Sequence, residues 1–567
     1  VNIYNMLERR QMQMHTLKLL LRTTAEDDAF LASVFLAVTK VHNKIVCEGK
    51  KRLRMLCRDK RYRYAKSHYG TTKEQCDKLE NKIAALEKKL TASEDKSERR
   101  VLRKQLKDLK SEHRAADAIR KNYGSEINEC LIRYGLTKSS MEVFATQWLN
   151  HKYKGTLNSQ QIQVEANRVW AGMEKVLFHD GKDIHYKKYR DIRSVRGKQN
   201  STGFRFNKDL LSVQYGKSGV IPVAYREKLE HAVAGEIKNK DLSYKMNSLS
   251  GEVRYCELVR EEFHDGYHYY ANLYLEGDAP KKIRPGSGRC GIDPGVSTVA
   301  AASEKELFLE ELAPRYREYD KQIYKLQQKS DKLRRELNPE YYNEDGTVVK
   351  RKPKEKRIWK TSPEYEDVMR KIRILYRKKT AYISISHSTL CNKLLKSTDV
   401  FRVEEMDFRA LARRAKETRR ADTTTTLTKP DGTTQEIRKF KRKKRFGKSI
   451  TSRSPGLFLE ILKRKCAQYG LDLQNTDTRS MKASQYDHTS DACQKHNLKD
   501  RILTLSDGSV VQRDLYSGFL QQHADAELKH PDRKMCTRDF PAFMKMQDAL
   551  ILRMRSEGIS MKHCFGF

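Results

Sequence analysis

Long apolar runs are missing from this sequence. No stretch approaches the roughly 20 apolar residues that span a bilayer, and the longest early run, Leu17 to Leu21, is far shorter. Residues 1–10 also carry no apolar signal-peptide core. We therefore expect a soluble cytoplasmic protein with no membrane partner.

Paired cysteines are missing as well. The 11 cysteines are odd in number and scattered, and no two of them form a CxxC pair. This usage is typical of free thiols in a reducing compartment and argues against a disulfide framework.

Acidic residues are scarce relative to basic ones. The 567 residues include 115 Lys and Arg but only 74 Asp and Glu, which gives a formal net charge of +41. Folding does not require this excess, and the self-repulsion it causes would be relieved by a polyanion. The expected partner is nucleic acid, bound chiefly through its phosphates. A ribosome-like or chromatin-like protein without chemistry fits the charge equally well.

The N-terminal part alternates between strand and helix signals. A strand-like run covers 14–22, and Thr24 with acidic residues after it predicts a helix start. Residues 50–66 are basic, with Tyr62 and Tyr64 interleaved, which favours a phosphate-tracking surface with stacking aromatics over a solvated helix face. The candidate nucleic-acid-binding residues here are Lys51, Arg52, Arg54, Arg61 and Arg63.

Two leucine-rich stripes predict a coiled-coil hairpin over 72–115, with its turn at 91–95 and Ser93 as the expected N-cap. A structural arm is the favoured interpretation, although its basic outer faces could also lie along RNA. From 201 to 280 the pattern changes to short strands, and two longer runs closing on Asp265-Gly266 predict a β-hairpin. We expect a small β-barrel or curled sheet in this segment.

The C-terminal half combines strands with a helical insertion. A strand around 290–296 is followed by helical patterns within 310–397 and by a second strand over 399–404. Residues 409–448 are predicted to be loose and strongly basic. This segment supplies the remaining candidate nucleic-acid-binding residues: Arg438, Lys439, Lys441, Arg442, Lys443, Lys444 and Arg445.

Three acidic residues are the candidates for chemistry. Phosphodiester hydrolysis needs charge neutralisation and an activated water, and two divalent ions supply both. Mg²⁺ prefers carboxylate oxygens. Asp293 and Glu404 end apolar strands, and Asp514 stands where a short apolar stretch meets a helix start. We predict that these three hold two Mg²⁺ ions and form a catalytic site.

The order and context of these motifs resemble the TnpB family of transposon-encoded nucleases, which are related to type V CRISPR effectors. Gly291-Ile-Asp-Pro-Gly resembles the family's first RuvC motif, the stretch around Glu404 the second, and Arg513-Asp514 the third. The match is strongest over 289–520.

The resemblance implies a multidomain α/β protein with an RNase H-like RuvC nuclease domain. It also implies a β-barrel wedge domain, at 1–22 and 201–280, interrupted by a helical recognition lobe at 23–200. The RuvC domain would cover 289–480, with its third motif and a tail at 510–567. The implied activity is RNA-guided endonucleolytic cutting of double-stranded DNA beside a short adjacent motif, by one site. Guide RNA and target DNA are the implied partners.

One feature departs from the family. The expected zinc ribbon at 481–509 has Asp487, Ser490, Thr504 and Asp507 where its two CxxC pairs should stand. Cys493, His488 and His496 lack the spacing of a tetrahedral site. We therefore expect no zinc and a metal-free loop that binds target nucleic acid.

Two other functions remain open. An RNA-guided DNA-binding protein without cleavage would lack some of the RuvC carboxylates, and this sequence keeps all three. A transposase or junction resolvase on the same fold would typically be smaller and need no RNA.

Overall fold

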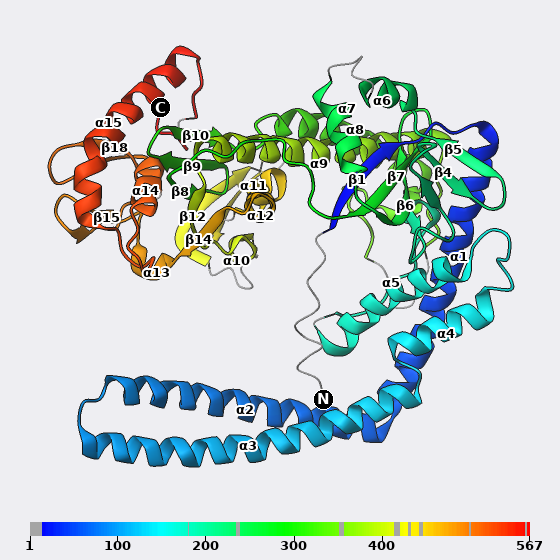
Figure 1. Ribbon diagram of the computed structural model, residues 1–567, viewed down its shortest axis with the longest axis horizontal. Helices are drawn as coiled ribbons and strands as arrows, with labels where there is room; N and C mark the ends of the chain where they lie inside the picture. Colours follow the sequence, from blue (N-terminus) through cyan, green and yellow to red (C-terminus); the bar gives the residue numbers. More distant parts are fainter. Residues whose placement is uncertain are drawn as a thin grey trace. The chain divides into compact units, whose positions relative to one another are not determined.

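The computed structural model describes residues 14–179, 181–233, 239–350, 357–412, 420–428, 433–440, 446–497, 500–561 and 564–567. The chain divides into two compact units, Val1–Pro280 and Lys281–Phe567. Figure 1 shows their helices and strands.

Two antiparallel sheets lie in the first unit. The larger has the order β1-β7-β6-β2, and the smaller the order β3-β4-β5. The strands are β1 (Met14–Leu20), β2 (Ser194–Arg196), β3 (Arg205–Asn207), β4 (Ser212–Tyr215), β5 (Gly219–Pro222), β6 (Val253–Glu262) and β7 (Tyr267–Glu276). The expected hairpin on Asp265-Gly266 is confirmed as β6 and β7, and β1 pairs with β7 from Met14–Glu276 to Leu20–Tyr270, so the two ends of this unit share a sheet. β2 was not expected, because it lies in a segment predicted to be helical.

Helices make up the rest of the first unit. They are α1 (Ala25–Arg58), α2 (Lys60–Ala92), α3 (Lys96–Arg133), α4 (Lys138–Leu149), α5 (Ser159–Phe178), α6 (Arg226–Val233) and α7 (Lys240–Ser248), with a 3₁₀ turn at Tyr189–Asp191. The predicted start of α1 is confirmed: the Thr24 hydroxyl accepts from the Asp27 N–H, while the Asp27 carboxylate accepts from the Thr24 N–H. This reciprocal pair satisfies two donors of the first turn.

α1 corrects one expectation from the sequence. Within the described residues it is long and apolar enough to cross a membrane by length and composition alone. Its most apolar 18-residue window is 56% buried inside the protein. Val34, Phe35 and Ile45 are fully buried there, as in a core helix.

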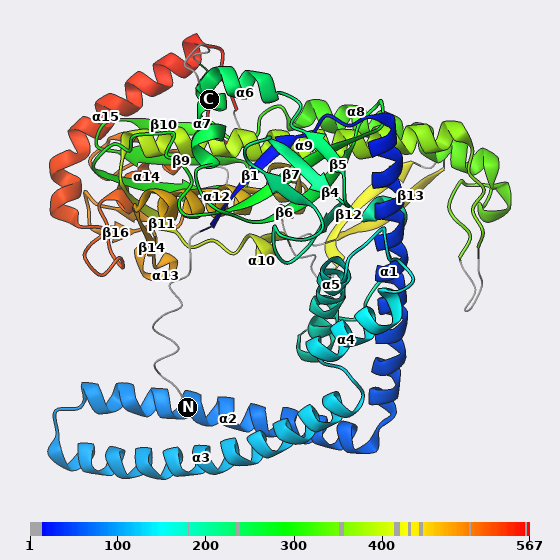
Figure 2. The same cartoon turned by 45° about the vertical axis from the view of Figure 1, so that its right-hand side comes forward.

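The predicted hairpin arm is present and is longer than expected. α1 gives way to α2 at Asp59, where the backbone is extended and the chain bends sharply, as Figure 2 shows. α2 and α3 then run side by side (Figure 1). The expected N-cap was wrong: Ser93 is the C-cap residue of α2, and the Asp95 carboxylate accepts from the Ser97 N–H at the start of α3. A carboxylate suits this position because it faces the positive end of the helix dipole.

The second unit is built on a five-stranded sheet of order β10-β9-β8-β11-β14. Its strands are β8 (Arg289–Pro294), β9 (Thr298–Ser303), β10 (Leu307–Glu311), β11 (Val400–Glu404) and β14 (Asp472–Thr476). β9 is antiparallel to both β8 and β10, whereas β11 is parallel to both β8 and β14.

Helices cover both faces of this sheet. The helices described in the second unit are α8 (Tyr316–Leu337), α9 (Pro363–Ser397), α10 (Phe408–Ala412), α11 (Gly447–Arg453), α12 (Pro455–Tyr469), α13 (Thr478–Met481), α14 (Arg513–Gln522) and α15 (Arg533–Ser556), with a 3₁₀ turn at Pro339–Tyr341. Ile292 and Phe401 face a core shared with α9 and α12, while Ala300 and Ala302 face a core shared with α14 and α15. α8 and α9 are the predicted helical insertion.

The described parts of the basic segment at 409–448 contain more regular secondary structure than predicted. They contain α10 and an antiparallel hairpin of β12 (Arg420–Thr428) and β13 (Thr434–Phe440). The run of threonines in β12 explains the strand, because β-branched side chains favour extended backbone.

Candidate functional site

Two of the three candidate carboxylates leave neighbouring strands at the same edge of the sheet. Asp293 is the penultimate residue of β8, and Glu404 is the last residue of β11. The two strands are parallel, and Val403 pairs with Ile292. The next residues, Glu404 and Asp293, therefore lie level with each other. Because side chains alternate along a strand, Asp293 and Glu404 point away from the core that Ile292 and Val403 face. Both therefore point to the face that α14 covers.

The third carboxylate, Asp514, is in the first turn of α14. Two glycines let this helix approach β8 closely. A Cβ atom on Gly291 would clash with the Gly518 carbonyl oxygen and the Gln522 N–H, and one on Gly518 would lie 3.2 Å from the Gly291 carbonyl oxygen. Gly518 is one turn after Asp514, so this close crossing holds Asp514 over the end of β8.

Buried Arg402 fixes the other end of the same helix. It extends from β11 on the α14 side, and its Nη1 donates to the carbonyls of Gln522 and Ala524 at 2.9 and 2.6 Å. A guanidinium there satisfies carbonyls that the helix end leaves unpaired. The sheet thus holds α14 at both ends, and Asp514 lies in the first turn of the helix, beside the ends of β8 and β11.

The three carboxylates interact electrostatically. Burial raises the pKa of Asp293 well above its ordinary value, and the negative charges of Asp514 and Glu404 raise it further. Burial also raises the pKa of Glu404. Like charges brought together out of water disfavour ionisation in this way. That these three residues share one metal site stays a prediction.

Two arginines hold the carboxylate of Asp514. Arg501 Nη1 lies 3.0 Å from Asp514 Oδ2, and Arg513 Nη2 lies 3.0 Å from Oδ1. Both arginines flank a hairpin of β17 (Ile502–Thr504) and β18 (Val510–Gln512), in which Ile502 pairs with Gln512. The sequence analysis missed Arg501. The Asp507-Gly508 dipeptide between two apolar stretches was the available signal, because it is typical of a hairpin turn and would place Arg501 beside Arg513.

The donor set matches the chemistry of Mg²⁺, which binds carboxylate oxygens. Within the described ranges, no three His, Cys, Asp or Glu side chains are arranged to hold a metal ion in this conformation. The Asp514 oxygens are directed at guanidinium groups instead. The observation that fits a cation is the placement of Asp293 and Glu404 at the ends of the neighbouring strands β8 and β11, beside Asp514 on α14.

Two small hairpins between residues 486 and 512 are joined by one carboxylate. β15 (Tyr486–Asp487) pairs with β16 (Ala492–Cys493), and β17 pairs with β18. Asp487 Oδ1 accepts from the N–H and hydroxyl of Thr489 at 2.9 and 2.7 Å, and Oδ2 accepts from those of Ser506 at 2.8 and 2.7 Å. Burial opposes ionisation here, but these hydrogen bonds outweigh it and hold the pKa of Asp487 well below its ordinary value.

Cys493 and His488, both within the expected zinc ribbon, have different surroundings. Cys493 is exposed. His488 is buried, with its Nδ1 2.8 Å from the Tyr516 hydroxyl and its ring against Phe540. His488 is therefore part of the core between α14 and α15.

The basic residues predicted at the end of α1 and the start of α2 differ in their surroundings. Lys51, Arg54 and Arg63 are exposed. Arg61 is exposed but pairs with Glu129 at 2.7 Å. Arg52 is not an open phosphate ligand, because its guanidinium donates to Glu48 at 2.9 Å and to the Gly135 carbonyl at 2.7 Å.

The interleaved tyrosines also differ. Tyr62 is buried, which corrects its expected stacking role. Tyr64 is 56% exposed and lies against His68 and Tyr123. Arg438 and Lys439 belong to β13, while Lys441, Arg442, Lys443, Lys444 and Arg445 lie outside the described residues.

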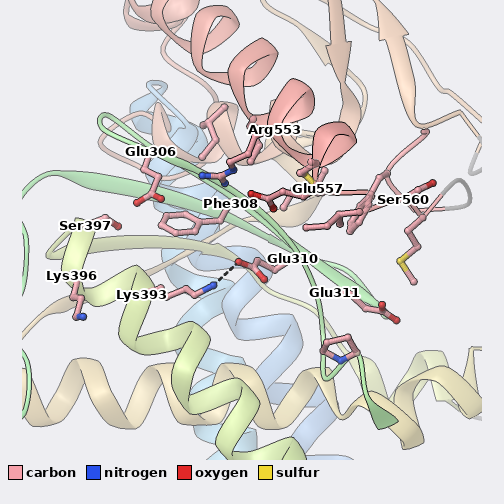
Figure 3. Close-up of a pocket in the computed structure, with 18 residues that line it drawn as sticks. Glu306, Phe308, Glu310, Glu311, Lys393, Lys396, Ser397, Arg553, Glu557 and Ser560 are labelled. Carbon is pink, nitrogen blue, oxygen red and sulfur yellow. Dashed lines mark hydrogen bonds and ion pairs between the residues drawn. The ribbon is translucent and has the colours of Figure 1, made fainter. Parts of the chain in front are cut away.

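A hollow of about 800 Å³ elsewhere in the second unit is lined by β10, α9, α15 and the residues after α15 (Figure 3). It carries charges of both signs, and Lys393 Nζ pairs with Glu310 at 2.9 Å (Figure 3). Its lining includes none of the three candidate carboxylates. The hollow lies along the outer strand of the sheet, so the carboxylate edge remains the candidate catalytic site.

No protein-family model and no curated protein sequence matches the chain. Among solved structures, the chain is similar to a Cas12f1–sgRNA–target DNA complex at 11% identity and a TM-score of 0.38, covering 89% of this chain and 98% of that one. A CRISPR-Cas12f ternary complex has 11% identity and a TM-score of 0.21, with 67% and 74% covered. A Cas12i–crRNA–double-stranded DNA complex has 10% identity and a TM-score of 0.24, with 94% and 66% covered.

Proposed function

We propose that this chain is an RNA-guided DNA endonuclease of the TnpB and type V CRISPR kind, cutting target DNA with a single RuvC-like site. The observation that carries the proposal is that Asp293 and Glu404 end neighbouring parallel strands on the face that α14 covers with Asp514, in a chain with a net charge of +41. A strongly basic protein concentrates nucleic acid on its surface. A cluster of carboxylates inside such a protein suits metal-dependent hydrolysis of the bound phosphodiester.

The sheet supports an RNase H-like nuclease domain. Counted along the chain, its five strands have the spatial order 3-2-1-4-5, with the first three antiparallel and the last two parallel to the first. Acidic residues then follow the first and fourth strands, which are neighbours. The proposed wedge domain corresponds to the two antiparallel sheets of the first unit, and the recognition lobe to α1–α5.

We further propose that Asp293, Glu404 and Asp514 hold two Mg²⁺ ions. When bound, these ions would neutralise the scissile phosphate and activate a water molecule. The protein itself supplies the rigid edge of β8 and β11 and the close crossing of α14, while Arg501 and Arg513 pair with the Asp514 carboxylate. We propose no zinc site here, since hydrogen bonds to Asp487 join the two hairpins between residues 486 and 512.

The proposed partners are a guide RNA and double-stranded target DNA with a short adjacent motif. The Cas12f1 and Cas12i structures named above are complexes with such molecules. Sequence would be recognised by base pairing with the guide, while the protein contacts backbone phosphates. Localisation in the cytoplasm follows from this proposal.

The test is a cleavage assay with the copurified RNA and a matching DNA duplex. Asp293→Ala, Glu404→Ala and Asp514→Ala should each lower cleavage by more than about 100-fold, since even residues behind metal ligands are worth roughly 10–100-fold. Guide and target binding should persist.

Glu405→Ala is the matched control, because Glu405 follows Glu404 directly and is exposed. Full cleavage by Asp293→Ala would reject the catalytic assignment. Binding without cleavage by the unaltered protein would indicate a guided DNA-binding protein.

A further inference from the structure

A groove of about 610 Å³ lies in the helical part of the first unit, apart from the carboxylate site. It is lined by the end of α1, by the residues that follow α3, and by one face of α4. Its size falls within the roughly 300–1,000 Å³ of pockets that hold small molecules. Nothing in the proposed nuclease chemistry uses it.

Apolar side chains stand along the rim of this groove. Trp148 on α4 is 70% exposed, Val143 on α4 is 49% exposed and Met55 on α1 is 38% exposed. A single exposed apolar side chain needs no explanation, but a contiguous group around a hollow marks a binding surface. An exposed tryptophan offers a flat aromatic face on which another ring can stack.

Cations surround the apolar rim. The Arg133 side chain lines the groove, is 58% exposed, and has only a distant contact with Asp59, at 3.9 Å. Lys51 and Arg58 lie one turn to either side of Met55 on α1, and both are exposed. Helical spacing of three and four residues places them on the same face as Met55. Positive charge beside an exposed aromatic ring suits a ligand with a π-face and a phosphate.

The groove is held in shape by Arg52. Its guanidinium donates to the Gly135 carbonyl at 2.7 Å and to Glu48 at 2.9 Å, and it lies over the Phe144 ring at 5.2 Å. These contacts tie α1 to the turn after α3 and to α4. Gly135 has a φ of +63°, and a Cβ there would press on this guanidinium. The walls are therefore already in place before a ligand binds.

We propose that this groove binds an unpaired nucleotide of the guide RNA, with its base stacked on Trp148 and its phosphates beside Arg133. Base stacking on aromatic residues combined with cations along the backbone is how proteins hold single-stranded nucleic acid. Exposed Ser139 and Gln147 line the same groove and offer polar groups to a ribose 2′-hydroxyl, which distinguishes RNA from DNA. The choice of guide RNA as the source rests on the proposed function.

Tryptophan fluorescence tests the stacking directly. The chain has three tryptophans, and Trp170→Phe with Trp359→Phe would leave Trp148 as the reporter in the full-length protein. A 12-nucleotide oligoadenylate RNA, the same sequence in DNA, and a 12-base-pair RNA duplex serve as probes, without Mg²⁺. Single-stranded RNA should quench Trp148 fluorescence, and should bind more tightly than the DNA or the duplex.

Substitutions at Trp148 complete the test in an otherwise unaltered chain. Trp148→Ala should weaken binding of the RNA probe by about 5- to 100-fold, and Trp148→Phe should retain most of the affinity. Leu552→Ala is the matched control, because Leu552 is 71% exposed on α15 in the other unit. An unchanged affinity in Trp148→Ala, or an unquenched Trp148, would overturn the proposal. Equal or tighter binding of the DNA would overturn the assignment to RNA. These experiments measure binding and not cleavage. Their results therefore test the groove even if the protein proves not to be a nuclease.

Discussion

Arg501 and Asp514 form an ion pair at the centre of the candidate site, with Arg501 Nη1 lying 3.0 Å from Asp514 Oδ2 and 3.2 Å from Oδ1. Their side chains are 22% and 12% exposed. The guanidinium thus lies against the oxygens that a divalent cation would need. Arg501 and a metal ion compete for the same carboxylate in this arrangement.

This competition predicts the effect of Arg501→Gln. A partly exposed ion pair is worth roughly 0.2–1 kcal/mol, so the Mg²⁺ concentration for half-maximal cleavage should fall by about 1.4- to 5-fold. A Mg²⁺ titration of the cleavage rate measures it. Arg538→Gln is the control, since Arg538 pairs with Asp539 on the exposed side of α15. A higher Mg²⁺ requirement in Arg501→Gln would show that Arg501 aids metal binding.

The crossing of α14 over β8 gives a second prediction. Gly291→Ala would place a Cβ against the backbone of Gly518 and Gln522, which cannot move aside like a flexible side chain. Overpacking of this kind costs about 1–3 kcal/mol or more. We expect a lower melting temperature and a loss of cleavage, because Asp514 would move away from Asp293.

Gly456→Ala is the matched control for that experiment. A Cβ at Gly456 would meet only the Phe408 ring, at 3.9 Å. Its melting temperature and cleavage should stay near those of the unaltered protein. Normal cleavage by Gly291→Ala would mean that the close crossing does not position Asp514.

Asp487 carries a prediction about stability and pH. Hydrogen bonds to a charged group are worth about 1.5–3 kcal/mol, so Asp487→Asn should lower the free energy of unfolding of the segment at 481–509 by about this amount near neutral pH. The folded-state pKa of Asp487 is below its ordinary value of 3.8. Its contribution is therefore complete above about that pH and is lost as pH falls below it.

Hydrogen exchange of residues 486–512 at several pH values measures this difference. The gap between the two proteins should close in acid, while Asp507→Asn, a change in a neighbouring exposed turn, should produce a smaller gap. Elemental analysis of the same samples should find well under one zinc per chain. A stoichiometric zinc that chelators remove would contradict a segment held together by Asp487.

Much of the candidate site could be predicted from local sequence. Apolar strands ending in acidic residues identified Asp293 and Glu404, and a strand-to-helix boundary identified Asp514. Their convergence could not be predicted from those patterns, because it depends on which strands are neighbours and on the Gly291–Gly518 contact, where residues far apart in the chain meet. The resemblance to a nuclease family, rather than periodicity, supplied the grouping.

Other misses have local physical causes. Ser93 and Asp95 are both acceptable helix caps, and only the length of the turn decides between them. Arg52 was predicted to bind phosphate because of its charge. In the structure its guanidinium instead pairs with Glu48 and the Gly135 carbonyl. β12 and β13 were missed because high polarity and many cations outweighed the β-branched threonines in the prediction.

The basic run at the end of β13 supports a final prediction about how nucleic acid is held. Lys439 lies in β13, whereas Lys441, Arg442 and Lys443 lie outside the described residues. Burying so many cations without partners would cost too much free energy, so the sequence predicts that they face solvent or phosphate. If they face phosphate, replacing all four by Gln should weaken RNA and target-DNA binding and reduce the slope of log affinity against log salt by about 0.7–0.9 for each phosphate that is no longer neutralised. Mismatch discrimination should not change, because phosphate contacts carry no sequence information.

The control variant replaces four exposed lysines of α8, Lys321, Lys325, Lys329 and Lys332, and so removes the same charge elsewhere. If the control variant shows the same loss of affinity and slope, the effect comes from net charge and not from this run. If the slope is unchanged in the first variant, the run faces solvent and does not contact phosphate.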